Sequence, residues 1–360
     1  MAYPFSPEAL AARAAPPIAL KAQGMFWVGL ERSKTGEATL ASGQMFVQYA
    51  IPQDLRCPWP LVLVHGGGGQ GTDYLVTPDG RPGWASFFLS RGYAVYVVDR
   101  PGHGRAPYDP NLLGPMGPSP SYEFIDSLFP HPERAAGYPQ ARLHDQWPTA
   151  RADGLDVMDQ LLAAMGPASA DLAQSHRGMQ QAGAALLDAI GPSIILTHSA
   201  GGPFGWVVAD ARPELVKAIV AVEPLGPPFL DRGPAGGLAW GATAIPLTFD
   251  PPAASPADLK PVEKPAPGPD LMACKVQGEP ARRLPNLSGF PIVVVTGEAS
   301  WMAQDNHGMV DFLTQAGCSA EHLRLEDHGV HGNGHMIMSE LNSDEAAAVI
   351  DGWIRERVPS

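Results

Sequence analysis

Apolar positions along this chain follow two alternating periods, and the alternation predicts the fold class. Short runs of β-branched and aliphatic residues, as in "PLVLVHGG" and "PSIILTHS", are separated by longer stretches whose apolar residues recur every three or four positions. Continuous apolar runs are typical of parallel strands buried on both faces, and the longer period is typical of helices that cover such a sheet. We therefore expect an α/β domain with a mostly parallel sheet.

Eight strands and six helices are expected from these patterns. The predicted strands are Met25–Arg32, Gln44–Ile51, Pro60–His65, Ala94–Val98, Ser193–Thr197, Lys217–Val222, Ile292–Thr296 and His322–Leu325. The predicted helices are Trp84–Arg91, Thr149–Ala164, Asp171–Ile190, Gly202–Ala211, Gly308–Ala316 and Ser343–Arg357. Before the last helix, Asn342 stands at the expected N-cap, with Glu345 at the reciprocal position of a capping box.

Two long segments, 106–147 and 224–291, interrupt the alternation because they are rich in proline and glycine and show little period. Irregular segments of this length inside a domain are usually covers over a functional site or disordered linkers. Both contain aromatic residues, such as Phe129 in the first and Trp240 in the second, which favours covers that line a pocket. Solvated loops with incidental aromatics are the alternative. We expect one domain over residues 1–360, with both segments as cap insertions.

Charge and cysteine content narrow the range of partners and compartments. The chain carries 24 Lys and Arg against 37 Asp and Glu, a net charge of −13, which repels nucleic acids and anionic membranes. No apolar run is long enough to cross a bilayer. Cys57, Cys274 and Cys318 are too few and scattered for a disulfide framework. The first 20 residues show no secretory signal, so we expect a cytoplasmic protein; a periplasmic or secreted one is the alternative if a signal was removed.

The segment Thr197-His198-Ser199-Ala200-Gly201 has the form of a nucleophile elbow. It follows an apolar strand and leads into a predicted helix, and small residues lie two positions from the serine on either side. Such a turn exposes the serine Oγ and leaves the next backbone amide at a helix N-terminus, where it meets negative charge. A serine that merely caps the helix is the alternative.

A glycine run after an earlier strand complements this serine. In "LVHGGGGQG", glycines follow His65 directly, and glycine lets backbone amides approach a developing oxyanion closely. We expect the oxyanion donors to be the amide of Ala200 and one amide among Gly66, Gly67 and Gly68. The sequence leaves open which of the three glycines it is.

The same glycines admit a second interpretation. Gly66, Gly68 and Gly71 have the G-x-G-x-x-G spacing of a dinucleotide-binding turn, and Asp99 ends the next strand. Proline and glycine break the segment where the phosphate-binding helix would begin, which disfavours this interpretation. A P-loop is excluded because Gly71 is followed by Thr72 and no lysine.

The general base is expected late in the chain. The loop "DHGVHGNGHMIM" carries His328, His331 and His335 among three glycines, after the last strand and before the last helix. His335 is the preferred base because Gly334 and Met336 allow a tight loop beside it, and His331 is second. A metal site of these three histidines is the alternative, although no accompanying carboxylate pattern supports it. We expect neither a metal nor a cofactor.

The acid of a catalytic triad is expected between Ser199 and the histidine, as in other hydrolases with this elbow. Glu223 ends an apolar strand in "AIVAVEPLG", and a buried carboxylate there needs a partner such as an imidazole N–H. Glu298 is second and Asp305 third. The position two residues beyond Glu298, where an aspartate commonly sits, is Ser300. A carboxylate at a solvated strand end is the alternative for Glu223.

Taken together, these motifs resemble the α/β-hydrolase superfamily. "HGGGGQG", "TPDGRPGW", "YAVYVVDRPGHGR", "THSAGG", "VEPLG" and "HGNGHMIM" occur in family order over Leu61–Trp353. This resemblance implies the α/β-hydrolase fold, with an eight-stranded, mostly parallel sheet, helices on both faces and proline-rich cap insertions. More narrowly, the chain is similar to the bacterial esterase 713-like serine esterases, whose acid is a glutamate after the sixth strand. That similarity implies a triad of Ser199, Glu223 and His335, an esterase activity and a homodimer.

We therefore expect a serine carboxylic ester hydrolase that acts through a Ser-His-Glu triad and an acyl-enzyme on a small or medium hydrophobic ester. Tyr74, Phe204, Trp206 and Trp301 are candidate pocket residues, although each residue type is more often part of a core. An amidase or a lactonase with the same triad is an alternative within the enzymes. A non-catalytic ligand-binding protein that keeps the fold is the alternative outside them.

Overall fold

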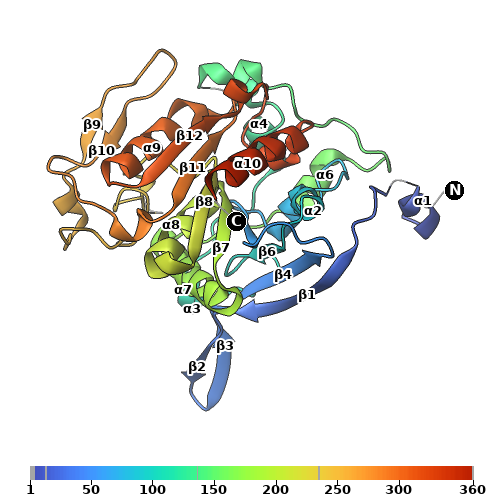
Figure 1. The fold of residues 1–360 in the computed structure, drawn as a ribbon, viewed down its shortest axis with the longest axis horizontal. Coiled ribbons are helices and arrows are strands. Elements are labelled where there is room, and N and C mark those ends of the chain that lie inside the picture. The colour runs from blue at the N-terminus through green and yellow to red at the C-terminus, as the bar shows by residue number, and fades with distance from the viewer. Residues whose placement is uncertain (1–4, 13, 136, 234–235, 359–360) are drawn as a thin grey trace.

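An eight-stranded sheet forms the centre of the computed structural model, which describes residues 5–12, 14–135, 137–233 and 236–358. Its strand order is β1-β4-β6-β5-β7-β8-β11-β12, and the six strands from β6 to β12 run parallel, whereas β4 is antiparallel to both neighbours. The strands are β1 (Leu20–Val28), β4 (Met45–Pro52), β5 (Leu61–Val64), β6 (Val95–Asp99), β7 (Ser193–His198), β8 (Val216–Val222), β11 (Pro291–Thr296) and β12 (Ser319–Arg324). The predicted mostly parallel α/β architecture is confirmed (Figure 1).

Helices cover both faces of this sheet. They are α2 (Trp84–Ser90), α6 (Val157–Ala163), α7 (Leu172–Ile190), α8 (Gly202–Ala211), α9 (Asn306–Gln315) and α10 (Ser343–Arg357). One apolar cluster joins the sheet to α7, α8 and α9 through residues such as Phe204 and Phe312. The other joins it to α2, α6 and α10 through residues such as Trp84 and Trp353. Because both faces are buried, the central strands read as continuous apolar runs in the sequence.

Two predicted elements differ from the structure by more than three residues at one or both ends. The helix expected over 149–164 begins only at Val157, because Gly154 turns the chain with φ +79° and Asp156 caps the helix by accepting from the amide of Asp159. This correction leaves the residues before α6 irregular.

The first predicted strand, Met25–Arg32, is also corrected. β1 ends at Val28, and Gly29 has φ +70°, so the chain leaves the sheet there. A separate hairpin, β2 (Glu31–Thr35) and β3 (Ala38–Ser42), follows and extends away from the body of the protein (Figure 1).

The first insertion, 106–147, folds over the carboxyl edge of the sheet. It contains three short helices, α3 (Pro110–Leu113), α4 (Tyr122–Leu128) and α5 (Pro132–Ala135). Directly after α4, the ring of Phe129 stacks on the ring of Trp147, with 6.5 Å between their centroids. Both side chains are buried, so this part of the insertion packs against the rest of the protein, whereas Tyr122 and Phe124 of α4 are exposed.

The second insertion, 224–291, packs differently from the expected pocket cover. It contains the small hairpin β9 (Val262–Lys264) and β10 (Cys274–Val276). Its Phe229 and Trp240 belong to the core cluster on the α9 side of the sheet. Its aromatic residues therefore extend the core and do not line a pocket, which corrects that expectation. Across the described part of the chain, no helix is both long and apolar enough to cross a membrane.

Candidate active site

The neighbouring strands β7 and β8 bring two candidate residues to one point on the sheet edge. His198 pairs with Val222 across these parallel strands, so Ser199 and Glu223 are the next residues on each. Their φ angles are 51° and 49°, in the left-handed region that non-glycine residues seldom adopt. Such a conformation costs about 1–3 kcal/mol per residue and is held only where the surrounding structure enforces it. Both chains turn sharply here, and both side chains reach the same edge.

The small residues after Ser199 are explained by crowding at this turn. A Cβ on Gly201 would collide with the carbonyl of His65, and one on Gly202 would lie 2.7 Å from the Cβ of Pro224. The carbonyl of Ser199 accepts a hydrogen bond of 2.9 Å from the amide of Leu225. The elbow is therefore packed on two sides by the ends of β5 and β8.

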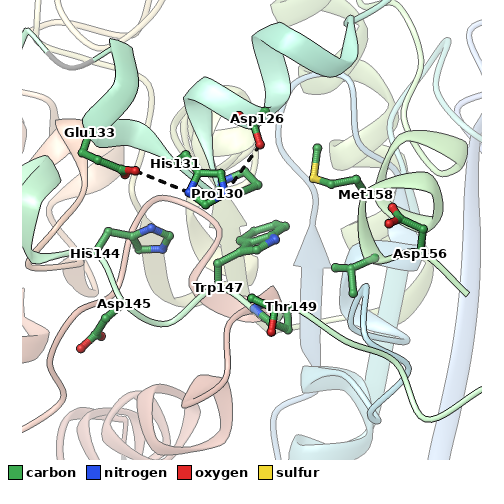
Figure 2. Close-up of a pocket in the computed structure, with 12 residues that line it drawn as sticks. Asp126, Pro130, His131, Glu133, His144, Asp145, Trp147, Thr149, Asp156 and Met158 are labelled. Carbon is green, nitrogen blue, oxygen red and sulfur yellow. Dashed lines mark ion pairs between the residues drawn. The ribbon is translucent and has the colours of Figure 1, made fainter. Parts of the chain in front are cut away.

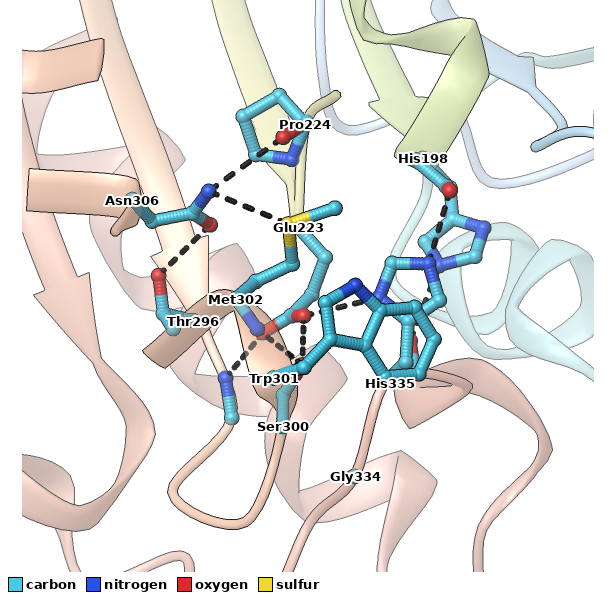
Figure 3. Close-up of polar contacts among 12 residues, drawn as sticks. His198, Glu223, Pro224, Thr296, Ser300, Trp301, Met302, Asn306, Gly334 and His335 are labelled. Carbon is cyan, nitrogen blue, oxygen red and sulfur yellow. Dashed lines mark hydrogen bonds and ion pairs between the residues drawn. The ribbon is translucent and has the colours of Figure 1, made fainter. Parts of the chain in front are cut away.

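His335 lies between Ser199 and Glu223. Its Nδ1 donates to Glu223 Oε2 at 2.9 Å, which leaves Nε2 as the acceptor for the hydroxyl of Ser199 at 2.8 Å. Burial lowers the pKa of His335, so the ring is neutral at rest and able to accept a proton. Figure 3 shows the imidazole directed at the carboxylate of Glu223.

Glu223 is fully buried and accepts hydrogen bonds on both oxygens. Oε1 accepts from the amide of Gly297 at 2.7 Å, and Oε2 accepts from the hydroxyl of Ser300 as well as from His335. Burial raises the pKa of Glu223, and the bonds from Ser300 and Gly297 oppose that rise. In the sequence, Ser300 stands two residues beyond Glu298, at a position where an aspartate is common. Here its hydroxyl serves the glutamate that comes from the neighbouring strand.

Glu298 and His331, which ranked second as acid and as base, pair with one another. Glu298 Oε2 lies 3.2 Å from Nδ1 of His331 and accepts from the amide of Gly332. The His331 side chain is 63% exposed, far more than the buried ring of His335. Asp305, the third candidate acid, is buried, and no contact joins it to His335; burial raises its pKa to about 7. Neither rival carboxylate touches the ring that faces Ser199.

The glycine loop lies against the elbow. A Cβ on Gly66 would be 3.0 Å from the Cβ of Ser199, and one on Gly67 would be 3.2 Å from the Cβ of Ala200. Both glycines line the cavity at Ser199. Gly68 has φ +69° and does not line that cavity; its carbonyl accepts from the amide of Gly166 instead. Of the three candidate glycines, the structure thus brings Gly66 and Gly67 to the serine.

A buried carboxylate that the sequence analysis missed supports the loop of His335. Glu340 accepts from the amide of Gly334 at 2.9 Å, from Nδ2 of Asn333 at 2.7 Å and from Nε2 of His144 at 3.1 Å. His144 belongs to the first insertion, so one carboxylate ties the cap to this loop. In the sequence, Glu340 stands in "IMSEL", an unremarkable context that predicts no such partners.

Asn342 occupies the predicted N-cap position of α10, but its side chain serves the loop of His335 instead of the helix. Its side chain donates to the carbonyl of His331 and to Oδ1 of Asn333, and it makes no capping hydrogen bond. The capping box predicted with Glu345 is therefore wrong. The side chain of Asn342 thus gives up a capping hydrogen bond, which typically stabilises a helix by about 1 kcal/mol, and donates to the loop instead.

Next to Ser199 lies a small cavity of about 30 Å³. Its apolar wall consists of Phe129, Leu161, Met165 and Met336, and Asp73 is its one carboxylate. A volume of this size holds about one water molecule. An ester can therefore occupy it only in part, unless the apolar wall moves.

The prediction of pocket aromatics is wrong for three of the four residues, because their side chains lie in the core. Tyr74 is buried and donates to the carbonyl of Val64, and Phe204 and Trp206 lie in the core because α8 is enclosed between the sheet and α7. Trp301 is the exception, since its ring centroid is 4.1 Å from that of His335.

A larger cavity of about 420 Å³ lies under the first insertion (Figure 2). Trp147 lines this cavity, and Phe129, which stacks on Trp147, lines the small one. Carboxylates also line the larger cavity, including Asp126, Asp145 and Asp156, and none of its lining residues is a lysine or arginine.

The metal interpretation of the three clustered histidines finds no support in the geometry. Over the described ranges, no three His, Cys, Asp or Glu side chains converge as metal ligands would.

Known proteins are similar to this chain in sequence and in fold. A family model described as "alpha/beta hydrolase fold" matches residues 60–257. The "Probable secreted lipase phiG" of a fungus, Fungal sp. (strain ATCC 74256), is 42% identical over 316 residues, which cover 87% of this chain and 86% of that protein. The solved structure of "a Novel Bacterial Esterase" superimposes with a TM-score of 0.63 at 24% identity, over 96% of this chain and 99% of that one. This last likeness concerns the fold alone.

Replacement of Glu340 by glutamine should loosen the loop of His335. The amide NH2 would face one of the three donors that the carboxylate now accepts from, which leaves buried groups unpaired. We expect a loss of about 1–3 kcal/mol in the free energy of unfolding, measured in urea, and a lower kcat on an aryl ester. Glu321→Gln, which removes an exposed ion pair with Arg357, is the control and should change stability by less than about 1 kcal/mol. Equal effects of the two variants would contradict the supporting role of Glu340.

Proposed function

We propose that this chain, which belongs to the α/β-hydrolase family and is a serine hydrolase of the carboxylesterase type, cleaves esters through a triad of Ser199, His335 and Glu223. The observation that carries the proposal is the position of the His335 ring, 2.8 Å from Ser199 Oγ and 2.9 Å from Glu223 Oε2. A nucleophile, a base and the group that orients the base need this arrangement for acyl transfer.

The proposed reaction has two steps. Nε2 of His335 takes the proton of Ser199 as Oγ attacks the ester carbonyl, and the amides of Ala200 and the glycine loop hold the oxyanion. The protonated ring gives its proton to the leaving alcohol, which produces an acyl-enzyme. Water, deprotonated by His335, then attacks the acyl group and releases the acid and Ser199. Glu223 keeps the proton of the imidazole on Nδ1 and stabilises the positive ring.

A hydrophobic ester is the proposed substrate class. The apolar wall of the small cavity, Phe129, Leu161, Met165 and Met336, favours an aliphatic or aromatic group beside the reacting carbonyl. The fungal relative is described as a lipase, which agrees with esters of apolar acids. The larger cavity beyond Phe129 and Trp147 offers the volume that the small one lacks.

Ser199→Ala should abolish turnover and leave the fold intact. Without the nucleophile, only oxyanion and binding contributions remain, so kcat on a p-nitrophenyl ester should fall by roughly 10⁴-fold or more. Release of p-nitrophenol measures the rate, and circular dichroism checks folding. Turnover by the alanine variant within tenfold of wild type would reject the proposed nucleophile.

The two candidate acids are separated by matched amide substitutions. In Glu223→Gln the single amide oxygen can still accept from Gly297, which places the NH2 donor opposite Nδ1 of His335. The imidazole then loses the carboxylate that holds its proton on Nδ1, so kcat should fall by about 10³–10⁴-fold, whereas Glu298→Gln should lower it by less than about tenfold. Both exchanges keep side-chain size and remove one negative charge, so kcat on the same ester compares them directly. A larger loss in the Glu298 variant would transfer the acid role to that residue.

We also propose that the protein acts outside the cytoplasm, as the alternative in the sequence analysis allowed. The fungal relative is described as a probable secreted lipase, which supports the alternative over the cytoplasm. Immunodetection in the culture medium and in cell fractions of the source organism tests this. Detection only in the cytosolic fraction would overturn it.

A further inference from the structure

A buried arginine lies directly behind the glycine loop. Arg100 follows β6, its side chain is 2% exposed, and no described carboxylate forms an ion pair with it. The adjacent Asp99 is bound to Arg105 instead, at 2.8 Å. Burial lowers the pKa of Arg100 to about 10, so the guanidinium still carries its charge at neutral pH. A buried cation without an ion-pair partner destabilises a fold, which calls for another reason for its presence.

The guanidinium points at the carbonyl of Gly66. Nη2 of Arg100 donates to that oxygen at 2.6 Å, while Nε is buried without a partner. The backbone amide of Arg100 donates to Nε2 of His65 at 3.0 Å, so the proton of this imidazole is on Nδ1. Nδ1 in turn donates to the same carbonyl at 2.9 Å. One backbone carbonyl thus accepts two hydrogen bonds, one of them from a cation.

This double anchor fixes the direction of the next amide. A trans peptide is planar, and its N–H points opposite to its C=O. With the Gly66 carbonyl held toward Arg100, the amide of Gly67 points away from that arginine. Gly67 itself lies against the elbow, since a Cβ built on it would be 3.2 Å from the Cβ of Ala200. The amide of Gly67 donates to no other group of the described chain.

We propose that Arg100 is a positioning residue for the oxyanion hole: together with His65 it holds the Gly66–Gly67 peptide so that the Gly67 amide donates to the oxyanion. The hydrogen bond from the cation also polarises that peptide, which makes its N–H a stronger donor where negative charge develops. This inference rests on the proposed function. It explains why the chain keeps a charge in the core that an apolar residue could replace with a gain in stability.

Arg100→Met tests the proposal because methionine fills much of the same volume without charge or donors. We expect kcat on a p-nitrophenyl ester to fall by roughly 10²-fold, with KM changed less than about threefold, as for loss of an oxyanion donor. Arg100→Lys, which keeps the charge and can still donate to the Gly66 carbonyl, should recover part of the rate. Arg151→Met is the matched control: it removes a nearly buried arginine that is paired with Asp153, and it should leave kcat unchanged.

An inhibitor pair separates positioning from a structural role. A trifluoromethyl ketone forms an oxyanion when Ser199 adds to it, whereas the matching secondary alcohol forms none. In Arg100→Met, the inhibition constant of the ketone should rise by about the same factor by which kcat falls, and that of the alcohol should stay constant. Equal changes for both inhibitors, or a kcat within twofold of wild type, would overturn the proposal.

Two further results are informative: an Arg100→Met variant that does not fold, and a wild-type protein that is inactive. If Arg100→Met does not fold, the ketone-to-alcohol ratio in Arg100→Lys decides, and an unchanged ratio overturns the proposal. An unchanged ratio in an enzyme that hydrolyses esters refutes only the role of Arg100. A wild-type protein that neither hydrolyses the ester nor binds the ketone refutes the proposed function and this inference together.

Discussion

The parallel register of β7 and β8 is the constraint on which the site depends. Because His198 pairs with Val222, the two chains leave the sheet at the same level, and each turns through a left-handed residue. Ser199 and Glu223 are thereby held side by side, at a spacing that one imidazole spans. A shift of one residue in this pairing would direct one side chain to the other face of the sheet. The geometry of the proposed triad is thus a property of strand pairing in a packed core.

The site concentrates features that a stable fold avoids. Two non-glycine residues have positive φ, Glu223 is fully buried, and Arg100 is buried without an ion pair. Each costs free energy of folding, and the apolar clusters on both faces of the sheet offset that cost. The second insertion adds to one of these clusters, which gives an energetic role to a segment that looked like a pocket cover. The strain is local, and the surrounding packing sustains it.

Polar contacts connect the first insertion to the loop that carries His335, the proposed base. Glu340 joins His144 of the first insertion to Gly334, the residue before His335. On the other side, Phe129 of the same insertion stacks on the ring of His335, with 6.1 Å between centroids. The first insertion is therefore connected to this loop in two ways, through Glu340 to the amide of Gly334 and through Phe129 to the ring of His335.

The sequence by itself determined the fold class, the strand and helix order and the elbow serine, because burial on both faces and a crowded turn leave local patterns in the residues. It also ranked Glu223 and His335 first among their rivals, since a carboxylate at the end of a buried strand needs a partner. Only the tertiary structure decided that this partner is His335, 112 residues away, and that Ser300, Glu340 and Arg100 serve the site. It also shows that the side chains of Tyr74, Phe204 and Trp206 lie in the core and do not line a pocket. Periodicity records which face of an element is buried, but not which distant side chain lies against it, because that depends on how the elements pack.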